Sequence, residues 1–264
     1  PENCRCISEI YFLMKFHWLR KLLNCILVLV GACSSTYAAD VSMAFGDRIP
    51  PYSFPESGSG IELEVIGEAL AFRGHRLQAQ YFPLARVPRA FVQGQVDAAM
   101  TDMGKDLSSL GGYYGDPAVL YNNVFVSLRD RKFVIKEPKD LKGLSIISFQ
   151  GGLKRYPLWL TAVKEAGNYH ETSKQNLQVL TLFAGRYDLV LSDKSIFKYF
   201  ALQLIEREWL YGKPFQMHEV FEIKPSDYRP IFRSHEIRDD FNAGLKYLKE
   251  SGRYHDIYHY YLKE

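Results

Sequence analysis

Hydrophobic residues along the chain change their spacing several times, and each spacing predicts a different element. Residues 41–45 alternate apolar and small side chains, which predicts a first strand. From Ile61 the apolar positions recur at helical spacing as far as Gly74, a good stop for a helix. We predict the next elements as a strand over 77–82, a short helix over 86–92 and a strand over 96–100. This alternating order predicts a parallel sheet with helices on its faces.

A second unit with the same kind of pattern follows. Residues 144–149 predict a buried strand, and Gly151 and Gly152 lead into a helix that runs to about Gly167. The later elements of this unit are predicted as a helix over 175–183, a strand over 187–191 and a helix over 194–204. A strand over 229–232 and two helices after residue 234 close the chain, the last with Ile257, Tyr260 and Tyr261 on one side.

Two extended runs, 122–128 and 215–223, are the candidates for passes of the chain between the two units. We therefore predict an α/β protein of two lobes, each a mostly parallel sheet flanked by helices. Lobe one is expected to combine residues 39–126 with 217–264, and lobe two to comprise 127–216. A plan of this kind places a ligand between the lobes, where strand ends and helix starts converge.

The first forty residues predict export. Met14 opens a stretch in which basic residues precede an apolar run over 22–30 and then small residues, which is the order of a secretory signal. The run is about ten residues long, whereas a membrane-spanning helix needs about twenty. We expect residues 1–38 to be a leader with a signal peptide, and a periplasmic chain to begin at Ala39. A lipoprotein acylated at Cys33 is the alternative.

Cysteine content and charge narrow the function further. All four cysteines precede Ala39, so the exported part has no disulfide and no thiol ligand for a metal. Residues 1–39 hold four of the 33 basic and two of the 30 acidic residues, which leaves 29 against 28. A nucleic-acid-binding protein needs a clustered basic face, and none is found, so this class is excluded. We expect no cofactor and a monomer.

Several short segments resemble the family of extracellular solute-binding proteins that serve polar amino acid uptake systems, often called family three. They occur in family order across nearly the whole exported part. The segments are Pro50-Pro51-Tyr52-Ser53-Phe54, Gly60-Ile61-Glu62-Leu63-Glu64-Val65, Gly94-Gln95-Val96-Asp97-Ala98, Asp140-Leu141-Lys142-Gly143, Gly185-Arg186-Tyr187-Asp188-Leu189-Val190-Leu191-Ser192-Asp193 and Ser251-Gly252-Arg253-Tyr254.

The resemblance implies a type II periplasmic-binding fold, hinge closure on a ligand and delivery to the membrane permease of an ABC transporter. One departure concerns the ligand. Family members that bind amino acids usually carry an arginine shortly after the strand that here ends at Met100, and that arginine binds the ligand carboxylate. The segment over 101–108 has no arginine. Pro83-Leu84-Ala85-Arg86 resembles a branch of the family with a proline and an arginine there, so Arg86 is a possible substitute.

Charged candidates for the site each have a structural alternative. Arg86 starts a predicted helix, and its guanidinium would bind a carboxylate through two hydrogen bonds, or it would be a solvated surface residue. Asp193 matches the family position that accepts hydrogen bonds from a ligand ammonium, and it would otherwise cap the helix that follows. Thr101 and Asp102 follow a strand, where open α/β sheets bind ligands, although Asp102 could equally cap a turn.

Backbone and aromatic candidates complete the predicted ligand site. Gly151 and Gly152 precede a helix whose free amide groups would suit an anion, and Arg155 would reach the same anion or face water. An ordinary strand-to-helix turn is the alternative for the two glycines. Tyr52 and Phe54 follow two prolines and would cover a ligand, or they would be packed residues of the rim.

No constellation in the sequence predicts catalysis, so we expect a protein that is not an enzyme. His255 and His259 have the spacing of some zinc sites, but exposed histidines of a terminal helix are the simpler interpretation. Two alternatives stay open. One is a periplasmic dehydratase on the same fold, with Glu64, Asp102 or Asp193 as its carboxylate. The other is a subunit that reports ligand binding to a membrane kinase.

Overall fold

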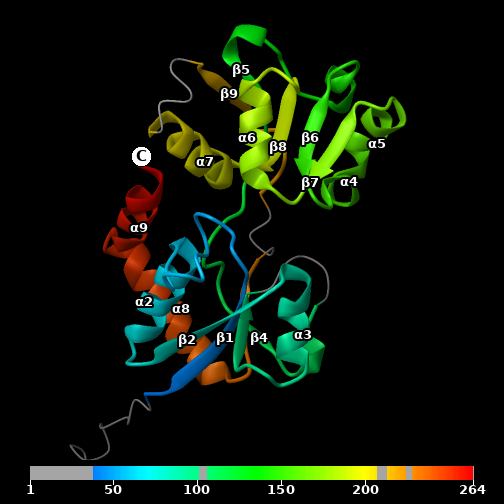
Figure 1. Ribbon diagram of the computed structural model, residues 1–264. Helices are drawn as coiled ribbons and strands as arrows, with labels where there is room; N and C mark the ends of the chain where they lie inside the picture. Colours follow the sequence, from blue (N-terminus) through cyan, green and yellow to red (C-terminus); the bar gives the residue numbers. More distant parts are fainter. Residues whose placement is uncertain (1–37, 101–105, 207–212, 224–227, 264) are drawn as a thin grey trace, which may run out of the picture. The chain divides into compact units, whose positions relative to one another are not determined.

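The computed structural model describes residues 38–100, 106–206, 213–223 and 228–263. The predicted signal peptide, Cys33, Thr101 and Asp102 lie outside these described residues. The elements form two separate five-stranded sheets, each with its own helices (Figure 1). Among the described residues no helix is both long and apolar enough to cross a membrane.

The first sheet has the strand order β2-β1-β3-β10-β4. Its central strand β1 pairs in parallel with β2 and β3, while β10 is antiparallel to β3 and to β4. Only β10 therefore runs against the other strands, which confirms the predicted mostly parallel sheet. The strands are β1 (Asp40–Gly46), β2 (Arg76–Phe82), β3 (Ala98–Met100), β4 (Tyr113–Tyr114) and β10 (Pro230–Phe232).

The second sheet repeats this arrangement in the order β7-β6-β8-β5-β9. Strand β6 is parallel to β7 and β8, and β5 is antiparallel to both β8 and β9. The strands are β5 (Asn123–Leu128), β6 (Ile146–Phe149), β7 (Tyr169–Thr172), β8 (Leu189–Asp193) and β9 (Phe215–His218). The two extended runs singled out in the sequence thus contain β5 and β9, which pair with each other in this sheet.

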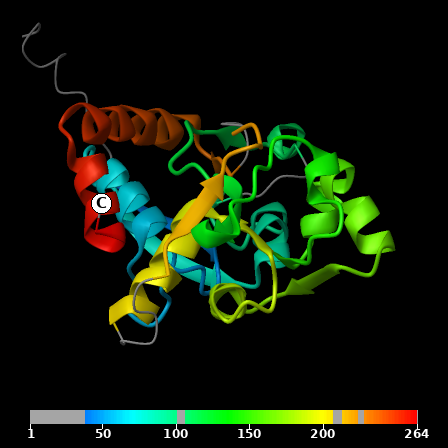
Figure 2. The ribbon, with the colours of Figure 1, turned by 90° about the horizontal axis from the view of Figure 1, so that it is seen from above.

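Helices cover the faces of both sheets. Those associated with the first sheet are α2 (Ile61–Ala71), α3 (Val87–Val92), α8 (His235–Glu250) and α9 (Arg253–Leu262). Those associated with the second are α4 (Gly152–Arg155), α5 (Pro157–Glu165), α6 (Gln175–Phe183) and α7 (Lys194–Glu206). Short 3-10 turns lie at η1 (Leu84–Arg86), η2 (Ser108–Leu110), η3 (Arg129–Arg131) and η4 (Pro138–Leu141). Figure 2 shows α8 running beside α2, and these two helices are in extensive contact.

Two predictions about helices are wrong in detail. The single helix expected up to Gly167 is two helices, α4 and α5, which are separated at Tyr156. Tyr156 precedes Pro157, and the proline ring disfavours helical dihedral angles at the residue before it. On α9, Ile257 is buried, but Tyr260 is 70% exposed, so Tyr260 does not share the buried face.

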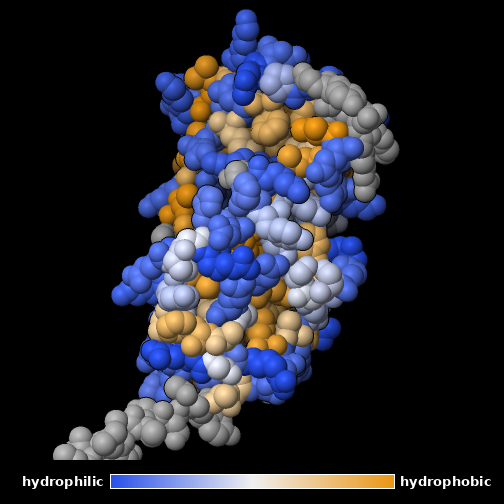
Figure 3. Space-filling view, turned by 90° about the vertical axis from the view of Figure 1, so that its left-hand side faces the viewer, coloured by the Kyte–Doolittle hydropathy of each residue, from blue (hydrophilic) through white to orange (hydrophobic). Residues whose placement is uncertain are grey.

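Aliphatic and aromatic side chains fill the space between each sheet and its helices. One cluster joins β1 to α2, α8 and α9, and includes Phe45, Ile66 and Phe241. The second sheet has apolar side chains on both faces, as expected for a mainly parallel sheet between helices. Figure 3 shows one face of the molecule, where hydrophilic residues predominate and apolar residues gather in separate patches. Because the strands are packed between helices, the residues at their carboxyl ends are held in fixed positions.

Candidate functional site

The predicted site residues follow the carboxyl ends of parallel strands. Tyr52 lies in the loop after β1, and Arg86 ends the η1 turn after β2. Gly151 follows β6, and Asp193 is the last residue of β8. Open α/β sheets bind ligands at this edge, because the strand-to-helix turns there expose amide groups and short loops. These carboxyl edges of the two sheets are therefore the candidate site.

Asp193 is the most fully bonded of these residues. Its Oδ1 accepts hydrogen bonds from the Tyr52 hydroxyl at 3.2 Å and from the N–H groups of Ser195 and Ile196, both at 3.0 Å. Its Oδ2 accepts one from the N–H of Asn122 at 2.8 Å. The side chain is 3% exposed. Asp193 therefore caps the start of α7 and also joins this helix to the loop after β1.

Burial dominates the acidity of this carboxyl group. It raises the pKa of Asp193 to about 6 from its ordinary value of 3.8, while the hydrogen bonds from Ile196, Asn122 and Tyr52 act to lower it. Burial and the charge of Asp193 together raise the pKa of the Tyr52 hydroxyl well above its ordinary range. The tyrosine therefore stays protonated and donates its hydrogen bond to the carboxylate.

Three tyrosines from separate parts of the chain stack beside this carboxylate. The ring centroids of Tyr52 and Tyr121 are 4.3 Å apart, and those of Tyr121 and Tyr228 are 4.2 Å apart. Tyr121 precedes β5 and Tyr228 precedes β10, so the stack contacts both passes of the chain between the sheets. The sequence analysis missed Tyr121 and Tyr228, because no local pattern signals rings that meet across 69 residues, as Tyr52 and Tyr121 do, or across 107, as Tyr121 and Tyr228 do.

Glu62 is a second buried carboxyl group at this stack, also missed from the sequence. It lies in the first turn of α2, is 2% exposed and accepts a hydrogen bond from the Tyr121 hydroxyl at 2.9 Å. Burial raises the pKa of Glu62 to about 7 from its ordinary value of 4.5, and the hydrogen bond from Tyr121 acts in the opposite direction. Glu62 therefore changes its charge near neutral pH.

Arg155 reaches the same stack from the second sheet. Its Nη1 donates to the Tyr228 hydroxyl at 2.9 Å, and its Nε donates to the Tyr156 hydroxyl at 3.1 Å. The guanidinium also lies 5.3 Å from the centre of the Tyr228 ring, in the range of a cation–π contact. Arg155 is thus brought near Tyr52 and Asp193 through the tyrosines rather than by direct contact.

The amide groups at the start of α4 are already paired with an anion of the chain itself. The Gly151 N–H donates to Glu171 Oε2 at 2.9 Å, and the Leu153 N–H donates to Oε1 at 3.0 Å. Partial burial of Glu171 acts to raise its pKa, but the hydrogen bonds from Gly151 and Leu153 outweigh it and lower the pKa. A ligand anion predicted at Gly151 and Gly152 would have to displace this side chain.

Arg86 and Phe54 lie apart from this group of side chains. Arg86 is exposed, and its guanidinium forms no ion pair with a described residue. Phe54 contacts Tyr199 of α7 and Tyr261 of α9, with ring centroids 5.6 and 5.9 Å apart. These three rings line a hollow of about 640 Å³, together with Glu64. The structure thus brings Tyr52, Arg155 and Asp193 together, whereas Arg86 and Phe54 have no hydrogen bond or ion pair with these three residues.

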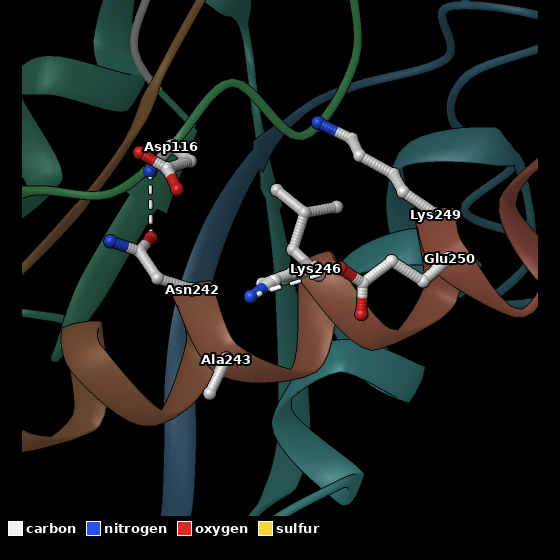
Figure 4. A pocket seen from close by; sticks show the side chains of 7 residues that line it. Asp116, Asn242, Ala243, Lys246, Lys249 and Glu250 are labelled. Atoms are coloured by element: carbon white, nitrogen blue, oxygen red, sulfur yellow. Dashed lines mark hydrogen bonds and ion pairs between the residues drawn. The ribbon is translucent and has the colours of Figure 1, made fainter.

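Two further features do not add to the candidate site. A hollow of about 540 Å³ lies along α8, where Asn242 accepts a hydrogen bond from the Asp116 N–H and Lys246 pairs with Glu250 (Figure 4). His255 and His259 are both exposed on α9. No group of three or more metal-ligating histidine, cysteine or acidic residues occurs among the described residues.

Comparison with solved structures identifies the fold. The second substrate-binding domain of Lactococcus lactis GlnP in its open conformation is 20% identical, with a TM-score of 0.62 over 85% of this chain and 95% of that one. An ancestral arginine-binding protein bound to arginine is 19% identical, with a TM-score of 0.59 over 86% and 99%. The probable amino-acid ABC transporter extracellular-binding protein YtmK of Bacillus subtilis is 15% identical, with a TM-score of 0.62 over 86% and 100%.

These matches show that the chain has the two-lobe, type II periplasmic-binding fold, as the sequence segments predicted. A histidine kinase sensor domain with similarity to periplasmic binding proteins matches comparably, at 18% identity and a TM-score of 0.57 over 84% of this chain and 96% of that one. No family model matches the sequence, and no curated protein matches it.

Proposed function

We propose that the chain is a periplasmic solute-binding protein that binds a small polar or charged metabolite, similar in size to an amino acid, for an ABC transporter. The observation that supports this proposal is the pair of mixed five-stranded sheets, in the fold of the amino-acid-binding proteins described above. The ligand would lie at the carboxyl edges of the sheets. The signal-like N-terminal segment supports export, and the membrane permease of the transporter would be the partner.

Binding without chemistry is part of the same proposal. The solved structures similar to this chain include proteins described as binding arginine or glutamine. Within the described residues, the polar groups at the carboxyl edges are donors and acceptors held in place by one another. Hydrogen-bonded groups of this kind orient a ligand.

A thermal-shift screen of amino acids, polyamines and small carboxylates tests the binding function. A compound that binds only the folded chain stabilises it by about 2.7 kcal/mol at a concentration one hundred times its Kd. We expect one chemical class to raise the melting temperature and to be recovered unchanged. No shift with any compound would contradict the proposal, and so would consumption of the compound.

Arg86→Ala is the first variant for this screen. Removing the guanidinium should weaken binding at least tenfold, because a two-hydrogen-bond contact to a carboxylate cannot be replaced by water at equal strength. Arg89→Ala is the matched control, since Arg89 is also exposed but lies one turn further, on α3. Equal affinity of both variants would remove Arg86 from the site.

Sensing is the second candidate function, and the kinase sensor domain of the same fold is the observation that favours it. Uptake of the labelled ligand by cells that lack this chain separates the two roles. Loss of uptake supports transport, whereas normal uptake together with loss of a ligand-dependent transcriptional response supports sensing.

A further inference from the structure

The buried side chain of His75 takes no part in the candidate site, although both of its ring nitrogens have partners. His75 lies in the turn between α2 and β2 and is 5% exposed. Its Nδ1 accepts a hydrogen bond from the Ala39 N–H at 3.2 Å, and its Nε2 lies 3.0 Å from Oδ2 of Asp240 on α8. From this geometry we infer that His75 and Asp240 form a binding site for the α-amino group that export would create at Ala39. The inference rests on the export that the proposed function includes, and not on the identity of the ligand.

The nitrogen of Ala39 fixes the direction of these hydrogen bonds. An amide N–H or an ammonium group can only donate, so Nδ1 of His75 must direct a lone pair at this nitrogen. The proton of the neutral ring is then on Nε2, which donates it to the Asp240 carboxylate. A carboxylate at one ring nitrogen orients a histidine and makes the other nitrogen a stronger acceptor. His75 therefore presents an oriented acceptor to the first residue of the expected exported chain.

Ala39 is also held on its carboxyl side. The Arg76 N–H donates to the Ala39 carbonyl oxygen at 2.9 Å. The next residue, Asp40, accepts two hydrogen bonds from the Arg76 guanidinium at 2.8 and 2.7 Å. Ala38 is exposed, whereas Ala39 is partly buried. The ordered hydrogen bonding of the main chain thus starts at the residue that would follow the expected cleavage.

A free ammonium group would form a stronger bond at this site than the amide does. A hydrogen bond from a charged donor is about twice as strong as one between neutral groups. At neutral pH an α-amino group is mainly charged, since its ordinary pKa is about 7.7–8.0. Asp240 is the acid in contact with the His75 ring, and Arg73 lies 3.8 Å from its other oxygen. Asp40 and Arg76 form an ion pair with each other. Removal of the leader at Ala39 should therefore stabilise the folded chain.

Blocking the α-amino group tests the inference. A chain that begins at Ala39 would be compared with the same chain acetylated at its N-terminus, which keeps the N–H donor and loses the charge. We expect the free chain to melt about 2–4 °C higher at about pH 7, the shift that one charge-assisted hydrogen bond gives in a domain of this size. The difference should be lost as the pH rises to about 9.5, because the amino group then becomes uncharged. Equal melting temperatures at about pH 7 would overturn the inference.

Two neighbouring acids on α8 supply a matched pair of variants. Asp240→Asn keeps an acceptor for the His75 ring and removes its charge, so acetylation should lower the melting temperature by less than half as much as in the unsubstituted chain. Asp239→Asn, at an exposed residue paired with Arg238, should leave the effect of acetylation unchanged. An undiminished effect in Asp240→Asn would show that the carboxylate does not support the site.

The intact mass of the exported protein identifies its first residue. We expect the protein recovered from the periplasm to begin at Ala39. Another first residue, or a lipid on Cys33, would overturn the inference but leave the proposed ligand binding intact. Failure of every compound in the thermal-shift screen would contradict the proposed function without affecting this site.

Discussion

Glu62 shows how one side chain can set the pH dependence of stability. Its folded pKa of about 7 exceeds its ordinary value of 4.5, so its contribution is favourable below pH 4.5 and is lost as the pH rises through about 7. Glu62→Gln keeps an acceptor for Tyr121 and stays neutral. We expect the variant to be more stable than the unsubstituted chain at about pH 8.5, by up to about 3 kcal/mol, and little changed at about pH 5.

Urea unfolding at the two pH values measures this difference. Glu165→Gln is the control, because Glu165 is exposed on α5 and should give no pH-dependent gain. A Glu62→Gln variant that gains no stability at the higher pH would show that Glu62 is not held in an unfavourable charged state.

Gln178 of α6 is a second residue whose polar side chain lowers the stability of the folded chain. Its side chain is fully buried, and neither amide atom has a hydrogen-bond partner among the described residues. Gln178→Met removes two unpaired polar atoms at similar volume and should stabilise the chain by about 1–3 kcal/mol. Gln203→Met, which removes a hydrogen bond to the Tyr199 hydroxyl, should instead lose stability in the same denaturation experiment. A loss in Gln178→Met would indicate that the amide binds a buried water.

At the residue scale, the sequence could identify Asp193 but could not decide its role. The family segment and the strand end both pointed to it, and a helix cap remained one of the two interpretations. The role of Asp193 depends on the hydrogen bonds that it accepts from Tyr52 and Asn122, which lie 141 and 71 residues away in sequence. Glu171 was missed for the same reason, since nothing near Gly151 signals a carboxylate 20 residues further on.

At the scale of elements, the contact between α2 and α8 depends on a glycine. A Cβ atom on Gly244 of α8 would lie 1.9 Å from the carbonyl oxygen of Ala69 in α2. Gly244→Ala should therefore push the helices apart and destabilise the chain by about 1–3 kcal/mol. Gly67→Ala is the matched control, because its Cβ would meet Leu77 at an ordinary 3.6 Å and should add about 0.5–1 kcal/mol of helix stability. Thermal unfolding of both variants should show shifts of opposite sign.

Elements with a strong hydrophobic period were predictable, and those without one were not. The strand β1 and the helix α2 lie close to their predicted limits, because each buries a regular set of apolar positions. Strand β7 has one buried residue followed by two exposed ones, so it lacks the alternation that identifies a strand. Strand β4 has only two residues, Tyr113 and Tyr114, and lies in a glycine-rich stretch that predicts irregular structure.

At the scale of the whole molecule, the titrating groups act in opposite directions. Glu62 and Asp193 have raised pKa values, so their contribution to stability is lost as the pH rises through about 6 to 7. Glu171 and Asp188 have pKa values below their ordinary values of 4.5 and 3.8, because hydrogen bonds to their charged forms outweigh burial. Their contribution to stability is lost as the pH falls through these lowered pKa values. We therefore expect the melting temperature to be highest near about pH 5. A melting temperature that keeps rising to about pH 8 would contradict this balance.

The general plan of two similar α/β halves was predictable, because each half repeats the same order of strands and helices. The pairing of the extended runs with each other was not, since β5 and β9 are about ninety residues apart in sequence and no local pattern signals a contact over that distance. For the same reason, single residues of the candidate site could be predicted from the sequence, but the hydrogen bonds between them could not, because they join distant parts of the chain.

The closely packed rings of Tyr52, Tyr121 and Tyr228 give the molecule an intrinsic spectroscopic signal. Aromatic rings about 4 Å apart in a fixed chiral arrangement couple their electronic transitions, and these rings come from three separate passes of the backbone. Any displacement of one of these three rings against the others changes the angles between them. Near-ultraviolet circular dichroism should therefore register such a displacement without a dye or an introduced label.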